Sequence, residues 1–147
     1  MDNKKNEVFF ETKKLTKKFG EVVAVNQVDM VIRTGEIRGL IGENGSGKST
    51  ISSMISAIHT VTDGEMLLYG KPYKPKDPGD ARAHGITMIV QEMGTTDGLT
   101  IAENIFVGDE KRFAHHGIIN RDEMNREAEK VLKNIGVTDV DVTRPAA

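Results

Sequence analysis

The sequence predicts an α/β fold, in which a β-rich beginning leads into a mixed core of strands and helices. Residues 1–35 are rich in β-branched and aromatic residues joined by short connections. A short apolar run at 36–41 leads directly into a glycine-rich loop and an amphipathic stretch, which is the order strand, loop, helix. After residue 91, two stretches carry helical periodicity and capping residues. In a chain of 147 residues, roughly one domain long, we expect three parts: 1–35, 36–91 and 92–147.

The first part and its junction with the loop contain four runs that we expect to be strands: 8–15, 22–25, 28–33 and 36–41. Gly20 supplies a turn after the first run, and Asn26 with Gln27 separates the second from the third. Glycine and asparagine are frequent where the chain turns. Further along, the β-branched and apolar runs 65–69 and 86–90 also predict strands, the second of them buried.

Helical signals follow the loop and recur toward the end of the chain. The stretches that carry them are 49–58, a short segment from Pro78 to Gly85, a segment capped by Thr100, and a longer one capped by Asn120 and ended by Gly136. Apolar residues recur every three or four positions in the first and the last. Thr100 and Asn120 are each followed three positions later by a glutamate, the spacing of a capping box. The stretch 109–119 has no clear period.

Composition excludes several classes of protein. The net charge of −2 gives no electrostatic footprint for nucleic acid. The absence of cysteine excludes disulfides and thiolate metal sites. The longest apolar runs fall far short of the about 20 residues that span a bilayer, and the first ten residues lack the apolar region of a secretory signal. We therefore expect any membrane association to come through a partner.

Lysines gather near the beginning of the chain, at Lys4, Lys5, Lys13, Lys14, Lys17 and Lys18. Acidic residues lie among them, so a solvated strand face is the simpler interpretation. A membrane-binding or nucleic-acid-binding patch is the alternative.

Residues 42–49, "GENGSGKS", fit the pattern G-x-x-x-x-G-K-[ST]. A loop that wraps phosphates must turn its amide groups inward, which glycines allow, and the following helix adds its positive N-terminal end. Lys48 is expected to reach the β- and γ-phosphates, and the Ser49 hydroxyl to coordinate Mg²⁺. The residues expected to bind nucleotide here are Gly42, Asn44, Gly45, Ser46, Gly47, Lys48, Ser49 and Thr50. The alternative is a glycine-rich turn that binds nothing, and the motif alone does not choose ATP over GTP.

The stretch "LTKKFGEVVAVNQVDMVIRTGEIRGLIGENGSGKST", residues 15–50, resembles the opening of an ABC-type ATP-binding cassette. The resemblance implies a P-loop NTPase fold of ABC type, with a β-rich N-terminal subdomain and a partial α/β core. In that family an aromatic residue upstream of the phosphate loop stacks on adenine, and Phe19 holds the matching place. The resemblance therefore implies ATP as the nucleotide. The alternative for Phe19 is a half-buried core side chain.

The stretch "ITMIVQEMGTTDGLTIAENIFVG", residues 86–108, is similar to the Q-loop region of the same family. Gln91 matches the Q-loop glutamine, which by resemblance helps to arrange Mg²⁺ and the attacking water. A carboxamide at the carboxyl end of a buried strand lies where ligands bind in such sheets. An ordinary loop glutamine is the alternative. The wording "TIAENIFVG" most resembles the first cassette of bacterial sugar importers of the ribose and galactose type.

A complete cassette of this family also needs a signature segment, an acidic strand, a D-loop and a late switch histidine, all beyond Gln91. By this resemblance, we expect the last residues of this sequence to correspond to the region about where the signature segment would begin. Asp139, Asp141 and the four histidines do not match the missing elements. We therefore expect these 147 residues to bind ATP without efficient hydrolysis. Without its neighbouring acidic strand, the run 36–41 would be an unpaired apolar edge, so the isolated chain is expected to be marginally stable or completed by a partner.

The resemblance implies the ATP-binding subunit of an importer, on the cytoplasmic face of the membrane. Its partners would be transmembrane permease subunits, a second cassette and, indirectly, an extracellular or periplasmic sugar-binding protein. One alternative is a nucleotide-binding module without turnover. Another is a non-transport ABC ATPase of DNA repair or translation, which the lack of a basic groove disfavours, so we expect no nucleic acid as a partner.

Overall fold

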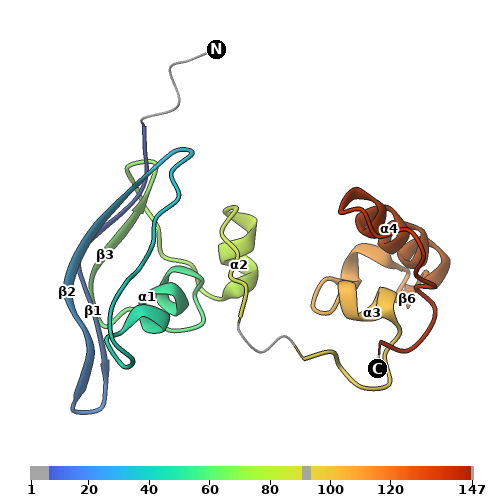
Figure 1. Ribbon diagram of the computed structural model, residues 1–147, viewed down its shortest axis with the longest axis horizontal. Helices are drawn as coiled ribbons and strands as arrows, with labels where there is room; N and C mark the ends of the chain where they lie inside the picture. The colour runs from blue at the N-terminus through green and yellow to red at the C-terminus, as the bar shows by residue number, and fades with distance from the viewer. Residues whose placement is uncertain (1–6, 91–93, 147) are drawn as a thin grey trace. The chain divides into compact units, whose positions relative to one another are not determined.

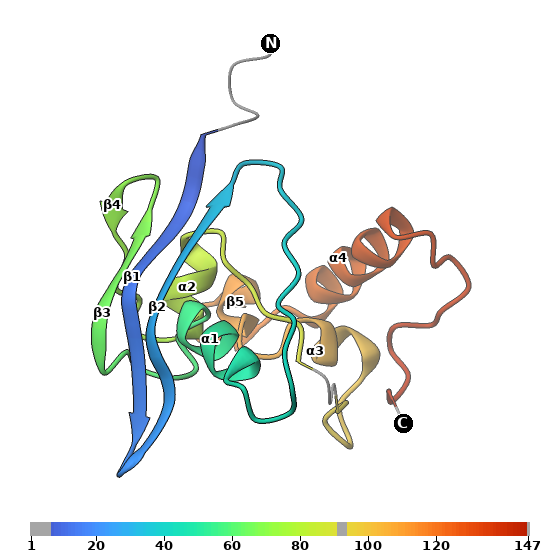
Figure 2. The ribbon, with the colours of Figure 1, turned by 60° about the vertical axis from the view of Figure 1, so that its left-hand side comes forward.

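The computed structural model describes residues 7–90 and 94–146 of the chain. It divides into two compact units, Met1–Ile89 and Val90–Ala147. Figure 1 shows the strands β1, β2 and β3 with α1 and α2 in the first unit, and α3 and α4 in the second; β4 of the first unit is labelled in Figure 2. Each unit is described by itself.

An antiparallel sheet of four strands, in the order β2-β1-β3-β4, forms the frame of the first unit. The strands are β1 (Val8–Phe19), β2 (Val22–Arg33), β3 (Asp63–Leu68) and β4 (Lys71–Pro72). The predicted strands 8–15 and 65–69 are confirmed, and Gly20 forms the β1–β2 turn with a φ of 56°. β1 lies between β2, which has the same length, and the shorter β3, so both of its edges carry strand hydrogen bonds.

The two predicted runs 22–25 and 28–33 are one strand, so the expected break at Asn26 and Gln27 was wrong. The pairing of β1 with β2 shifts register on both sides of Leu15 instead. Gln27 takes a φ of 50°, and its backbone N–H donates to the Thr16 hydroxyl oxygen at 3.1 Å. A bulge of this kind absorbs an irregular residue without ending the ladder.

Helix α1 (Lys48–Ile55) and helix α2 (Pro78–Ala83) close one face of this sheet. Their contribution to the core is Ile51, Met54 and Ala81, packed with the strand residues Phe10, Leu15, Val25 and Met66 and with Tyr73. α1 ends three residues earlier than the predicted 49–58, because Ala57 turns to a φ of 60°. Asp77 caps α2 by accepting from the Asp80 amide, and the helix predicted between Pro78 and Gly85 is confirmed.

Two predicted strands, 36–41 and 86–90, do not form in the structure. Figure 2 shows the first of them as a trace without an arrow between β2 and α1. Ile37 and Ile41 are fully exposed, at 101% and 97%, and Ile89 is 83% exposed. A strand exists only where a neighbour takes its backbone hydrogen bonds, and no strand in the described part of the chain lies beside either run. The sheet of the first unit is therefore wholly antiparallel.

The second unit is a small helical body with its own core. Its elements are α3 (Ile101–Ile105), the 3₁₀ turn η1 (Glu110–Phe113), the hairpin strands β5 (Ala114–His115) and β6 (Ile118–Ile119), and α4 (Arg121–Asn134). The core residues are Ala102, Phe106, Phe113, Met124, Ala128 and Val142. Both bonds of the predicted capping box at Thr100 and Glu103 are present, and the Asn120 side chain accepts from the Glu123 amide. The final segment folds back, with the Ala102 amide donating to the Val142 carbonyl.

Within residues 7–90 and 94–146, no helix is long and apolar enough to cross a bilayer.

Candidate nucleotide-binding site

The glycine-rich loop leads into α1 through two glycines with positive φ, Gly45 at 83° and Gly47 at 90°. Among the α-helices that the structure describes, only α1 lacks a side-chain cap and an acidic residue in its first turn. The first amides of a helix have no acceptor within the helix and carry partial positive charge. The N-terminus of α1 therefore offers its amides and its dipole to an anion.

Lys48, the first residue of α1, lies over this loop. Its Nζ donates to the carbonyl oxygens of Gly42 at 2.8 Å and Glu43 at 2.7 Å, and lies 3.5 Å from Ser46 Oγ. None of its hydrogen-bond partners in the described part of the chain is a carboxylate. Its positive charge is thus not neutralised by an acid, and phosphate oxygens would compete with neutral carbonyls for it.

The loop is tied to the β1–β2 hairpin through Gly47, which is buried against Ala24 and Val25 of β2. A few residues away on the same strand, Val22 pairs with Phe19 at the hairpin end. The register of β2 therefore brings the phosphate loop and the predicted base-stacking residue to the same end of the sheet.

Phe19 is the last residue of β1 and remains 44% exposed. Its ring meets the His59 ring edge to face, with centroids 5.2 Å apart and planes at 78°. The Lys17 ammonium lies 5.0 Å from the centroid of the same ring. Sequence reasoning singled out Phe19 but assigned Lys17 to a solvated strand face, and it did not connect the ring with His59, which lies 40 positions away.

The remaining predicted ligands lie on the loop or on the first turn of α1. Asn44, Ser46 and Ser49 are exposed and Thr50 is half-buried, so their polar groups are accessible. The Ser49 hydroxyl suits Mg²⁺, which prefers oxygen ligands. Gln91 lies outside the described residues. Within the described ranges, no group of three or more His, Asp or Glu side chains could hold a metal ion.

The side chains of His84 and His115 contact residues close to them in the sequence. His115 Nε2 lies 2.9 Å from Glu123 Oε2, and His84 Nδ1 lies 2.8 Å from the Asp80 carbonyl oxygen. No role in a nucleotide site follows from these contacts.

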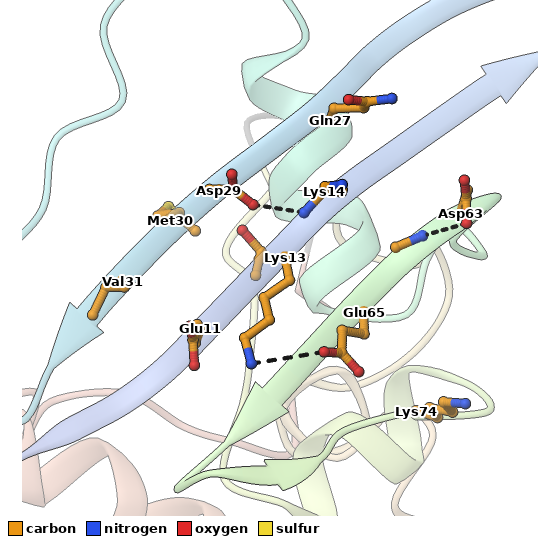
Figure 3. A pocket seen from close by; sticks show the side chains of 12 residues that line it. Glu11, Lys13, Lys14, Gln27, Asp29, Met30, Val31, Asp63, Glu65 and Lys74 are labelled. Carbon is orange, nitrogen blue, oxygen red and sulfur yellow. Dashed lines mark hydrogen bonds and ion pairs between the residues drawn. The ribbon is translucent and has the colours of Figure 1, made fainter.

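A hollow of about 820 Å³ lies elsewhere, over the strands of the sheet (Figure 3). Lysines and acids alternate in it: Lys13 Nζ lies 3.8 Å from Glu65 Oε1, and the Lys14 amide donates to Asp29 Oδ1 at 2.7 Å. None of the predicted nucleotide ligands lines it. These two lysines of the N-terminal cluster therefore belong to a mixed, solvated strand face rather than to a basic patch.

Comparisons with known proteins show which sequences and structures this chain resembles. The sequence profile described as ABC transporter matches residues 25–147. The chain is 43% identical over 126 residues to the ribose import ATP-binding protein RbsA 2 of Escherichia coli O157:H7, covering 86% of this chain and 24% of that protein. It is 41% identical to RbsA of Rhodopirellula baltica, covering 95% and 27%. The xylose import ATP-binding protein XylG of Moorella thermoacetica is also 41% identical, with coverage of 86% and 25%.

This chain spans about a quarter of the length of these curated relatives. A solved ATP-binding cassette of an ABC transporter, MJ1267, superposes with a TM-score of 0.75 at 26% identity, over 95% of this chain and 58% of that one. The cassette MJ0796, solved as a dimer with ADP and Pi, has a TM-score of 0.67 at 23% identity, over 93% and 61%, and supports the fold.

Proposed function

The chain belongs to the ABC transporter family, and from that premise we propose that it is the nucleotide-gripping portion of an importer's ATP-binding subunit. The cargo is proposed to be a sugar, because ribose and xylose importers are among its relatives. The subunit would lie on the cytoplasmic face of the membrane and contact permease subunits, which in turn receive sugar from an external binding protein.

In this proposal ATP binds along the loop and the hairpin end beside it. The loop amides and Lys48 take the β- and γ-phosphates, and the Phe19 ring stacks on adenine. Ser49 is proposed to hold Mg²⁺ together with Gln91, and the ion would neutralise phosphate charge. Among these groups, those that lie in the described residues are accessible or bonded only to neutral acceptors.

One observation carries the proposal: the uncapped N-terminus of α1 and the Lys48 ammonium converge on one loop, and the Lys48 ammonium has no carboxylate among its hydrogen-bond partners in the described residues. A structural turn has no need of this arrangement, since each of the other three α-helices in the described residues has an N-cap side chain that accepts from an amide of its first turn. The convergence of two positive groups on exposed backbone is what a triphosphate requires.

We assign hydrolysis to a complete cassette paired with a second one. Phosphoryl transfer depends on positioning and on charge stabilisation around the γ-phosphate. The residues described above would bind the phosphates from one side. This chain by itself is proposed to bind ATP without efficient turnover.

Nucleotide binding is tested by equilibrium dialysis of the 147-residue chain with Mg-ATP, in which the affinity of Lys48→Ala is compared with that of Lys71→Ala. Lys71 is an exposed lysine of β4 and serves as the matched control. Removing a charged donor to the phosphates should weaken binding at least about tenfold, whereas the control should bind as the unaltered chain does. Equal binding by both variants would exclude the proposed site.

The importer role is tested by a chimaera. The 126-residue matching segment of RbsA 2 from Escherichia coli O157:H7 is replaced by the corresponding residues of this chain, and ribose uptake is measured in cells lacking the original protein. We expect uptake, and we expect Lys48→Ala in the same chimaera to abolish it. A chimaera that is expressed and binds Mg-ATP, yet imports neither ribose nor xylose, would favour a nucleotide-binding module of another kind.

A further inference from the structure

Two groups from different parts of the first unit meet at the Phe19 ring. The Lys17 ammonium lies over the ring, 5.0 Å from its centroid, and the His59 ring meets it edge to face at 5.2 Å. Phe19 and Lys17 come from β1, whereas His59 follows α1. An exposed phenylalanine at a hairpin end would ordinarily rotate among rotamers, and these contacts restrict that rotation.

Lys17 is held in this place and is not a mobile surface lysine. It is only 8% exposed, and its Nζ donates to the Thr60 carbonyl oxygen at 2.6 Å and to Thr60 Oγ1 at 3.2 Å. The segment that carries Thr60 is itself bonded to β1, through Thr62 N to the Thr16 carbonyl at 3.0 Å. A buried ammonium needs such partners, and here they keep the cation beside the aromatic ring.

His59 is fixed from the other side by the end of α1. Its backbone N–H donates to the Ser53 carbonyl at 3.0 Å, just after Ala57 turns the chain with a φ of 60°. The same helix begins at Lys48, in the phosphate loop. α1 therefore begins at the phosphate-binding end of the site with Lys48. The residue that contacts the Phe19 ring, His59, follows shortly after the end of the same helix.

We propose that Lys17 and His59 are positioning residues for the nucleotide base. They hold the Phe19 ring so that the face turned away from the ammonium is offered to a planar base. The cation behind the ring also draws π-electron density from it, which lowers the repulsion between the ring and an electron-rich purine stacked in front. This inference rests on the proposed function, because it refines how that site holds the base.

The test separates base binding from phosphate binding. Calorimetry gives the dissociation constants of Mg-ATP and of magnesium tripolyphosphate, and their ratio is the base preference. An unfolded fraction of a variant lowers both apparent affinities by the same factor, so the ratio reports on the base site even for a partly folded variant. A loss of general stability cannot produce a change in this ratio.

The variants are Phe19→Ala, Lys17→Met and His59→Ala, with Lys18→Met as the matched control on the exposed side of β1. Phe19→Ala should lower the base preference about tenfold or more. Lys17→Met and His59→Ala should each lower it about threefold to tenfold, since each removes one contact of the ring. Lys17→Arg and His59→Phe keep a cation and a ring, respectively, and should restore most of it.

The outcomes distinguish the inference from the function on which it rests. If the unaltered chain binds neither ligand, the proposed function fails and the inference fails with it. If ATP binds and Phe19→Ala lowers the base preference while Lys17→Met and His59→Ala leave it unchanged, the inference alone is overturned. If Phe19→Ala also leaves it unchanged, Phe19 does not stack on the base and its neighbours position nothing.

Discussion

Gly47 and Ala24 lie in direct backbone contact: a Cβ added to Gly47 would stand 2.5 Å from the Ala24 carbonyl oxygen. It would also lie 3.2 Å from Cγ2 of Val25. The contact joins Gly47 of the phosphate loop to β2 close to the hairpin turn, two residues after Val22. A glycine there serves two purposes, because the position also has a φ of 90°.

Gly47→Ala should therefore be more damaging than Gly45→Ala. Both glycines have a positive φ, but a Cβ on Gly45 meets nothing within 4 Å. The strain of a positive φ costs about 1–2 kcal/mol for a non-glycine residue and should account for all of the Gly45→Ala effect. Gly47→Ala adds a collision with backbone, so its free energy of unfolding should fall by more than about 2 kcal/mol. Urea denaturation followed by circular dichroism measures both, and equal losses would show that the Ala24 contact does not matter.

The exposed isoleucines of 36–41 should be dispensable for the stability of this chain. Replacing Ile37 and Ile41 by serine removes no buried contact, so the free energy of unfolding should change by less than about 0.5 kcal/mol per site. Self-association should fall, because exposed apolar backbone without strand partners invites pairing with another chain. Sedimentation velocity at increasing concentration gives the second quantity.

Met54→Ala is the matched buried control for that experiment, since Met54 is 1% exposed in the core. It should cost about 2–5 kcal/mol. If the double serine variant lost as much stability as Met54→Ala, the segment would be packed in solution and the description of 36–41 would be wrong.

Turns and helix caps could be predicted from the sequence, whereas the fate of the apolar runs 36–41 and 86–90 could not. Turns and caps depend on neighbouring residues, so Gly20, Thr100 with Glu103, and Asn120 were predicted correctly. The run 36–41 has a strand's composition, but a strand also requires a neighbour, and composition does not supply one. The same holds for 86–90, whose apolar pattern predicts a buried strand.

The candidate site likewise has a part that the sequence could predict and a part that it could not. The phosphate loop is contiguous in sequence, so its residues and the helix that follows could be predicted from spacing alone. The surroundings of Phe19 could not, because Lys17 and His59 meet the ring only through the fold. The buried state of Lys17 was also missed, since a lysine in a charged run is normally solvated.

The second unit should lose stability in acid in part through Glu103. The Thr100 amide, donating to Glu103 Oε2 at 2.9 Å, holds the pKa of this carboxyl below its usual value, with a smaller contribution from Arg121. Because the folded pKa is the lower one, the stabilisation is complete above the unfolded pKa of about 4.3. It is lost as the pH falls through the folded pKa.

Glu103→Gln isolates this contribution, because glutamine can still accept from the Thr100 amide but does not titrate. Hydrogen exchange of the α3 amides, Ile101–Ile105, reports local stability at pH 7 and at pH 3. The advantage of the unaltered chain over Glu103→Gln should shrink toward pH 3. Glu110 and Asp141, whose pKa values are also lowered, are present in both proteins and cancel in the difference. An advantage that is the same at both pH values would contradict the role of the Glu103 charge.

The central claim is that this chain binds a nucleotide through the phosphate loop and the N-terminus of α1. The most direct test is a titration of the 147-residue chain with Mg-ATP, in which phosphate release is followed in the same sample. We predict one ATP bound per chain, and phosphate release no faster than from a Lys48→Ala chain. Failure to bind Mg-ATP at millimolar concentration would contradict the claim.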